Sequence, residues 1–131
     1  MSMELEIMVP DGVVVQTRIS ALSAANASGR FGLLPRRQKF LTLLVPCVLS
    51  FREADGRERY AAADGGALLM TKGRVSIVTR EAVVADRLDE VADAAESMLE
   101  ARRKHEETAR AEFAGLRARL LREPGSAERR D

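Results

Sequence analysis

The chain has 131 residues, a formal net charge of +1 at neutral pH and a single cysteine. This length suits one domain, or one compact unit with an appendage, and excludes two large cores. The near balance of acidic and basic residues argues against a bulk attraction to nucleic acid or membrane. One cysteine cannot form an internal disulfide, and no apolar run approaches the roughly 18 residues that a membrane span needs. With no secretory signal recognisable at the first residues, we expect a cytoplasmic protein.

The first part of the chain shows the alternation that is typical of strands with one buried face. Small and apolar residues alternate with more polar ones along Val13–Ala21, and again along Cys47–Glu53. Between that second run and Arg57–Ala63 lies Asp55-Gly56, which accepts positive φ and suits a tight hairpin. We therefore predict that Cys47–Glu53 pairs with Arg57–Ala63.

Further short strands are predicted up to residue 85. A second turn is expected at Asp64-Gly65-Gly66, and a third at Lys72-Gly73 between Ala67–Thr71 and Arg74–Thr79, before a last strand at Glu81–Ala85. No helix of ordinary length fits before Ala85. The pattern predicts a sandwich or barrel of about ten short strands.

From Ala85 the apolar period changes to that of an α-helix. A polar gap, "RRKHEE", separates two apolar sets, and Pro124-Gly125 ends the pattern. The gap lacks Gly, Pro and Asn, which favours one long helix. A hairpin bending near Lys104–Thr108 would bury more of the stripe, and we predict that hairpin. The apolar sets are Leu88, Val91, Ala95, Met98 and Leu99, and then Ala109, Phe113, Leu116, Leu120 and Leu121.

The predicted class is therefore mostly β with C-terminal α. The expected domains are a β-sandwich over residues 1–85, an antiparallel two-helix hairpin over 86–123 and a solvated tail over 124–131. Acids prevail in the first half of the helical segment and bases in the second half. The helix dipole alone explains this order, and a basic contact surface on the second helix explains it equally well.

Few residues could carry catalysis or bind a metal. We interpret His105 as a solvated helix residue, because a general base needs an oriented partner in a cleft. We interpret Cys47 as a small buried side chain and not as a reactive thiol, because nothing near it in sequence would lower its pKa. "SGRFG" lacks the full glycine pattern of a phosphate loop and opens into a strand. We expect no enzyme, no metal and no cofactor, and the scarcity of stacking aromatics argues against a nucleic-acid platform.

The order of elements and several motifs resemble the epsilon subunit of F-type ATP synthases. That family carries a glycine, a Phe/Leu-Gly-Ile/Leu-x-Pro loop, an apolar strand, a Leu-x-Pro-Gly turn and a Gly-Gly or Asp-Gly turn. The matching residues here are Gly29, Phe31-Gly32-Leu33-Leu34-Pro35, the strand Phe40–Val45, Val45-Pro46 and Ala63-Asp64-Gly65-Gly66.

The chain also departs from the family's usual pattern. Arg36-Arg37 stands where Gly-His is usual, and Cys47 follows Pro46 where glycine is usual. The linker between the two predicted helices is short for the family. The arginine directly after Leu34-Pro35, together with "LVPCVLSF" and "VSIVTREAV", looks more like the alternate, N-type and often sodium-linked branch of these ATPases.

The resemblance implies a non-catalytic rotor subunit that joins the gamma shaft to the c ring, at the cytoplasmic face of a bacterial inner membrane. It implies no homo-oligomer. The loop after Gly29 would face the c ring through Arg30, Phe31, Leu33, Leu34, Arg36 and Arg37. The alternative is that Phe31 and Leu34 fold inward as core and the arginines are merely solvated.

The resemblance also bears on regulation. In the family the second helix can contact the beta subunits and inhibit hydrolysis, a role that would fall to Arg110, Arg117, Arg119 and Arg122. The competing function is a nucleotide-sensing module with a mobile helical pair. ATP-sensing members open the first helix with Ile/Leu-Asp-x-x-Arg-Ala, whereas Ala92 and Asp93 occupy the last two positions here. This departure predicts no ATP binding below about 1 mM.

Overall fold

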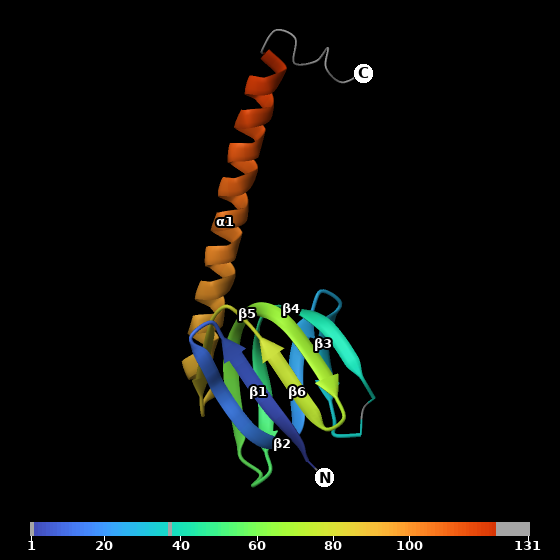
Figure 1. Cartoon of the computed structure of the whole chain (residues 1–131). Coiled ribbons are helices and arrows are strands. Elements are labelled where there is room, and N and C mark those ends of the chain that lie inside the picture. The colour runs from blue at the N-terminus through green and yellow to red at the C-terminus, as the bar shows by residue number, and fades with distance from the viewer. Residues whose placement is uncertain (1, 37, 123–131) are drawn as a thin grey trace. The chain divides into compact units, whose positions relative to one another are not determined.

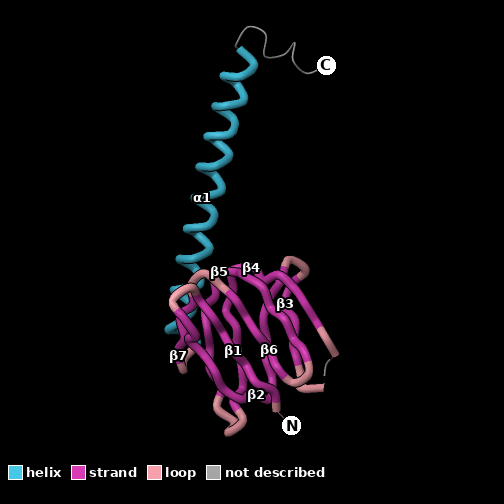
Figure 2. The backbone as a smooth tube through the Cα atoms, viewed as in Figure 1, coloured by secondary structure: helices cyan, strands magenta, loops and turns pink. Residues whose placement is uncertain are grey.

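The computed structural model describes residues 2–36 and 38–122, the side chain of Arg122 excepted. This part of the chain forms seven strands and one helix (Figures 1 and 2). The elements are β1 (Met3–Val9), β2 (Gly12–Asn26), β3 (Gly29–Leu33), β4 (Phe40–Glu53), β5 (Glu58–Thr71), β6 (Arg74–Val78), β7 (Ala82–Ala85) and α1 (Leu88–Arg122). The chain divides into two compact units, residues 1–99 and residues 100–131.

The strands form one sheet that closes on itself. Its order is β1-β6-β5-β4-β2-β3, with β7 beside β5, and β1 pairs both with β6 and with β2. The β1–β6 pair is parallel and the other pairs are antiparallel. Large apolar side chains from most of the strands fill the interior, among them Leu5, Ile19, Leu49 and Phe51. The predicted β-sandwich or barrel is confirmed.

The strands are fewer and longer than the predicted ten, because predicted neighbours merge. The chain runs through Pro46 within β4 and through Asp64-Gly65-Gly66 within β5, so the turn predicted at Asp64 is wrong. The β4–β5 register holds without a slip from Phe40↔Met70 to Arg52↔Glu58. Gly66 has φ +113°, and a Cβ there would collide with the carbonyl oxygen of Val78. Gly66 thus serves close packing between strands, and the two glycines do not end the strand.

The other two glycine turns are hairpins, as predicted. Gly56 has φ +95°, and β4 and β5 pair on either side of it. Lys72 and Gly73 connect β5 to β6 with φ values of +25° and +77°. Two successive positive φ values are typical of the turns that match the twist of a two-stranded ribbon.

The helical part is one helix of 35 residues, so the predicted two-helix hairpin is wrong. The residues around the predicted bend have good helix propensity. Glu106 also pairs with Arg102 one turn before it (3.6 Å) and with Arg110 one turn after it (3.9 Å). Such i,i+4 pairs stabilise a helix. Local preference therefore prevails over the burial that a hairpin would gain.

The first turns of α1 pack on the sheet within the first compact unit. Val91 is fully buried and Met98 is 7% exposed, and both cluster with Ala62 of β5. Val48 and Tyr60 border this cluster. From Glu100 to Leu121 every side chain that the structure describes is exposed. The apolar stripe predicted from Ala109 onward therefore packs against nothing in the described second unit.

Candidate interaction surfaces

An exposed apolar surface covers parts of β4, β5 and β6. Leu41 is 67% exposed, Leu43 75%, Leu69 36% and Val78 54%. The register places Leu41 opposite Leu69, and Ala67 between Leu43 and Val78. Side chains alternate across a strand, so these residues share the outward face, while Leu68 and Met70 point into the core. We call Leu41, Leu43, Ala67, Leu69 and Val78 the leucine face.

This surface was not predicted, although the sequence carries a signal for it. In "FLTLLV" apolar residues occupy every position except Thr42. A strand with one buried face should alternate instead. The run therefore indicated a strand that is apolar on both faces, one against the core and the other free for a partner.

The loop expected to face the c ring divides between core and surface. Leu33 is 1% exposed and lies opposite Leu22 of β2, so it is a core residue and not a contact residue. Phe31 is half-buried, with its ring centroid 5.5 Å from that of Phe40. Leu34, the next residue after the strand, is 64% exposed. Of the apolar residues in this prediction, Leu34 alone is well exposed.

The first basic residue of the same segment, Arg30, contacts the neighbouring strands. The Arg30 guanidinium donates hydrogen bonds to Ser23 Oγ and to the Val48 carbonyl oxygen, both at 3.0 Å. Arg30 therefore lies across β2 and β4. Arg36 is exposed, and Arg37 lies outside the described residues.

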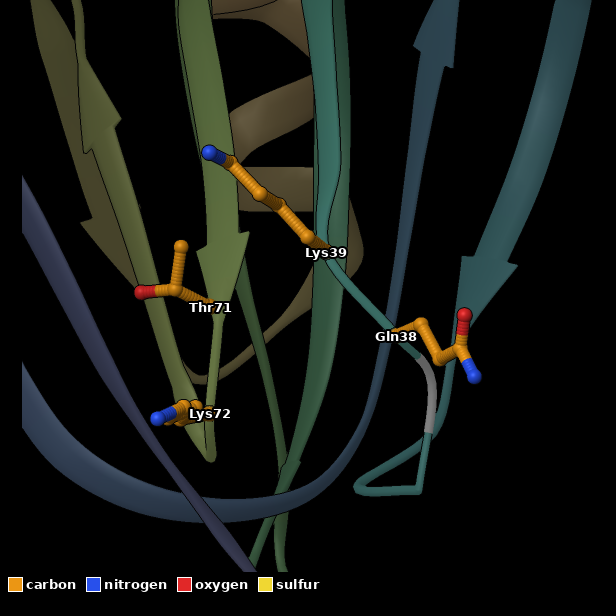
Figure 3. Close-up of a pocket in the computed structure, with 4 residues that line it drawn as sticks. All are labelled: Gln38, Lys39, Thr71 and Lys72. Atoms are coloured by element: carbon orange, nitrogen blue, oxygen red, sulfur yellow. The ribbon is translucent and has the colours of Figure 1, made fainter.

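A groove of about 520 Å³ lies where this loop meets the end of β5. It is lined by Gln38, Lys39, Thr71 and Lys72. Figure 3 shows Lys39 extending towards the strand that carries Thr71 and Lys72, while the Gln38 side chain points the other way. Both lysines are exposed. A smaller hollow of about 180 Å³ lies over β2 and β4, beside Ser50 and Arg52.

The four helical arginines do not share one face of α1. Arg110 and Arg117 are seven residues apart and lie on the same side, because seven residues make nearly two turns. Arg119 is two residues beyond Arg117 and so lies about 200° around the helix from it. Arg122 ends the helix. A single flat acidic surface could meet only part of this set.

The groups considered for catalysis lie apart. Burial raises the pKa of the Cys47 thiol, which favours the unreactive protonated form. His105 is exposed on α1. Among the described residues, no three His, Cys, Asp or Glu side chains are close enough to hold a metal ion. Within the described residues, no helical stretch is both long enough and apolar enough to span a membrane.

Residues 2–85 match the model of a known family, described as the beta-sandwich domain of the ATP synthase delta/epsilon chain. The chain belongs to this family. The match ends where β7 ends, so it covers the closed sheet but not the helix.

Curated relatives and a solved structure agree with this assignment. An ATP synthase epsilon chain 2 of Cereibacter sphaeroides is 34% identical over 93% of this chain and 85% of its own length. One of Paraburkholderia xenovorans is 37% identical, but the match covers 66% of this chain and 64% of that relative. A chain from the Euglena gracilis mitochondrial ATP synthase, solved with OSCP, F1 and the c-ring, is 23% identical with a TM-score of 0.61. It matches over 73% of this chain and 62% of its own length, and shows the shared fold.

Proposed function

We propose that this protein is the non-catalytic epsilon subunit of an F-type ATP synthase and joins the gamma shaft to the c ring. In the bacterial complex it is peripheral, on the cytoplasmic side of the inner membrane. Family membership supports this role. The observation that carries it in the structure is the leucine face: a rigid closed sheet presents large apolar side chains where a lone protein would gain by burying them.

The leucine face is the proposed contact with gamma. An apolar centre with polar residues around it is the usual composition of a stable protein interface. Leu43 is the most exposed large apolar residue of the sheet, and it lies opposite Ala67, where little bulk shields it. Burying such side chains on a partner gives most of the binding energy at a few central positions.

The tip of the loop after β3 is the proposed contact with the c ring. Leu34 supplies the apolar side chain, and Arg36 and Arg37 follow it after Pro35. Arg30 and Phe31 belong to the strand that positions this tip. Leu33 anchors it in the core. The c-ring surface is thus narrower than the six residues expected from the resemblance.

Binding to the F1 subcomplex of the same organism, freed of its own epsilon subunit, tests the contact with gamma. We expect Leu43→Asp to weaken binding at least tenfold, about 1.4 kcal/mol, because a carboxylate would be buried in an apolar interface. Val13→Asp is the matched control, since Val13 is 50% exposed on β2, outside the leucine face. Both variants should keep the melting temperature. Unchanged binding of Leu43→Asp would refute the proposal.

The c-ring contact has its own test. Leu34→Asp should leave binding to F1 unchanged and should weaken association of that F1 complex with c-ring membranes. Because Leu34 is already exposed, the free protein should unfold at the same temperature. A large drop in melting temperature would mean instead that Leu34 is structural.

Regulation by the helix is the remaining part of the proposal. Arg110, Arg117, Arg119 and Arg122 are the proposed contacts with acidic beta-subunit surfaces, and their spread around α1 requires contacts on more than one side. The stretch Leu88–Asp93 gives ATP no arginine, and Asp89 there pairs with Arg87 at 3.1 Å. We expect calorimetry to detect no ATP binding below about 1 mM. Membership of the N-type branch is likewise a proposal, based on Arg36 and Cys47.

A further inference from the structure

We propose that Lys39 and Lys72 form a cationic groove that receives carboxylate side chains of the subunit docked on the leucine face. This inference rests on the proposed function, because it extends the same interface by one row of residues. It names what the docked partner must carry at that edge: Asp or Glu side chains, next to the apolar residues that cover the leucines.

The groove is continuous with the leucine face. The β4–β5 register pairs Leu43 with Ala67 and Leu41 with Leu69. Lys39 and Thr71 each adjoin the last pair of this register, Phe40↔Met70, and they line the groove together. Because side chains alternate with period two, Lys39 and Thr71 have the same outward orientation as the leucine pairs. Figure 3 agrees, since Lys39 reaches towards the strand that carries Thr71.

The segments that build the groove carry positive charge without acids. Gly12–Arg52 contains six Lys and Arg residues and no Asp or Glu, and Gly65–Arg80 contains three and none. Within residues 2–36 and 38–122, no carboxylate lies within ion-pair distance of Lys39 or Lys72. Elsewhere in the sheet Arg57, Arg59, Arg74 and Arg80 all have carboxylate partners. The groove therefore holds charge that no carboxylate in the described part of the chain pairs.

The backbone at Lys72 also indicates a function. Its φ of +25° makes it the one described non-glycine residue with a positive φ. Gly and Asn take this conformation at lower cost than lysine. A residue held in such a conformation against its preference suggests that its side chain is needed there.

A docked protein is a better candidate for the occupant of the groove than a free anion. Exposed ammonium groups attract a single anion only weakly in water, where salt screens them. When an apolar contact excludes water beside them, the same charges pair more strongly and fix the register of the partner. The adjacent leucine face supplies that contact.

The test measures the affinity of the full chain for the epsilon-depleted F1 subcomplex at several salt concentrations. We expect the double variant Lys39→Glu/Lys72→Glu to bind about tenfold more weakly and to lose much of the salt dependence. The charge-matched control is Arg18→Glu/Arg52→Glu, on exposed positions of β2 and β4, which should bind as the native protein does.

A second variant separates binding from folding. Lys72→Asn removes the charge and relieves the backbone, so it should raise the melting temperature while it weakens binding severalfold. A purely structural role for Lys72 would not give opposite signs. Equal or tighter binding of Lys72→Asn would overturn the inference.

The outcomes distinguish the two proposals. If Leu43→Asp weakens binding but both lysine variants bind like the control, the proposed function stands and the groove inference fails. If Leu43→Asp has no effect on binding to F1, the proposed contact with gamma fails, and the groove inference that rests on it fails with it. Direct binding of the free protein to phosphatidylglycerol vesicles or to inorganic phosphate, lost in the lysine double variant, would replace the carboxylate partner with a lipid or a free anion.

Discussion

Arg59 Nε of β5 donates a hydrogen bond to Asp86 Oδ1 at 2.9 Å, which ties the residues just before α1 to the sheet. The same guanidinium contacts Glu53 Oε1 at 3.1 Å and lies over the Phe51 ring, 5.9 Å from its centroid. Arg59 thus links a buried carboxylate to the start of the helix. The two carboxylates differ in exposure, since the Glu53 side chain is 11% exposed and that of Asp86 is 72% exposed.

This difference predicts unequal costs of substitution. Glu53→Gln should lower the free energy of unfolding by about 1 to 3 kcal/mol, because it weakens charged hydrogen bonds to Arg57 and Arg59 in a buried place. Asp86→Asn should cost less than about 0.5 kcal/mol, because exposed ion pairs contribute little. Urea unfolding of the two variants measures both values. A larger loss for Asp86→Asn would contradict the assignment.

Gly66→Ala should be among the most destabilising substitutions in the sheet. A methyl group there collides with the Val78 carbonyl oxygen at φ +113°, so we expect a loss of more than about 3 kcal/mol or failure to fold. Gly56→Ala is the control, because Gly56 has φ +95° but open space around its Cα. It should cost only about 1 to 2 kcal/mol. Similar melting temperatures for the two variants would mean that crowding at Gly66 does not matter.

Truncation tests where the folded unit ends. A chain ending at Glu100 should be nearly as stable as the full chain, because it keeps Val91 and Met98 buried against Ala62. A chain ending at Asp86 should still fold, since the sheet has its own core, but should lose about 3 to 5 kcal/mol through the missing burial. Circular dichroism and thermal unfolding give both results. Loss of all structure after the shorter truncation would show that the sheet depends on the helix.

The hairpin carboxylate of Asp55 gives a pH prediction. A hydrogen bond from the Arg57 backbone N–H, with the Arg57 charge as a smaller contribution, holds the pKa of Asp55 below its usual value. The stabilisation is therefore present above the unfolded pKa of about 3.9 and is lost as the pH falls through the lower folded pKa. Asp55→Asn, which can still accept that hydrogen bond, should melt below the native protein at pH 7. The gap between the two melting temperatures should close as the pH falls below 4; a gap of constant size would argue against the shift.

The sheet was largely predictable because its signals are local. Alternation marked Val13–Ala21 and Cys47–Glu53, and Asp55-Gly56 and Lys72-Gly73 fixed two hairpins. The merging of strands at Asp64-Gly65-Gly66 could not be read from the sequence, because the same glycines serve a tight turn and a close approach of Gly66 to Val78. β1 was not singled out, although Met3, Leu5 and Ile7 alternate with more polar residues and are fully buried.

The helix and the surfaces were harder to predict. The propensity of the residues around His105 indicated one helix, and the opposite choice placed too much weight on burial within the chain itself. Leu33 was assigned to the surface because a motif shows where a loop lies but not which way each side chain faces. The leucine face and the lysine groove depend on the pairing of Leu41 with Leu69, two segments far apart in sequence.

The closure of the sheet by β1 has a consequence for how the protein is made. Glu4 pairs with Arg74 in the parallel β1–β6 ladder, so β1 is synthesised well before its partner β6 in the same sheet. Before β6 emerges, β1 can form only its hairpin with β2. Joining such distant segments costs chain entropy before any contact repays it. Final closure of the core is therefore expected only after β6 has emerged, and the unpaired edge of β1 needs protection from misfolded partners until then.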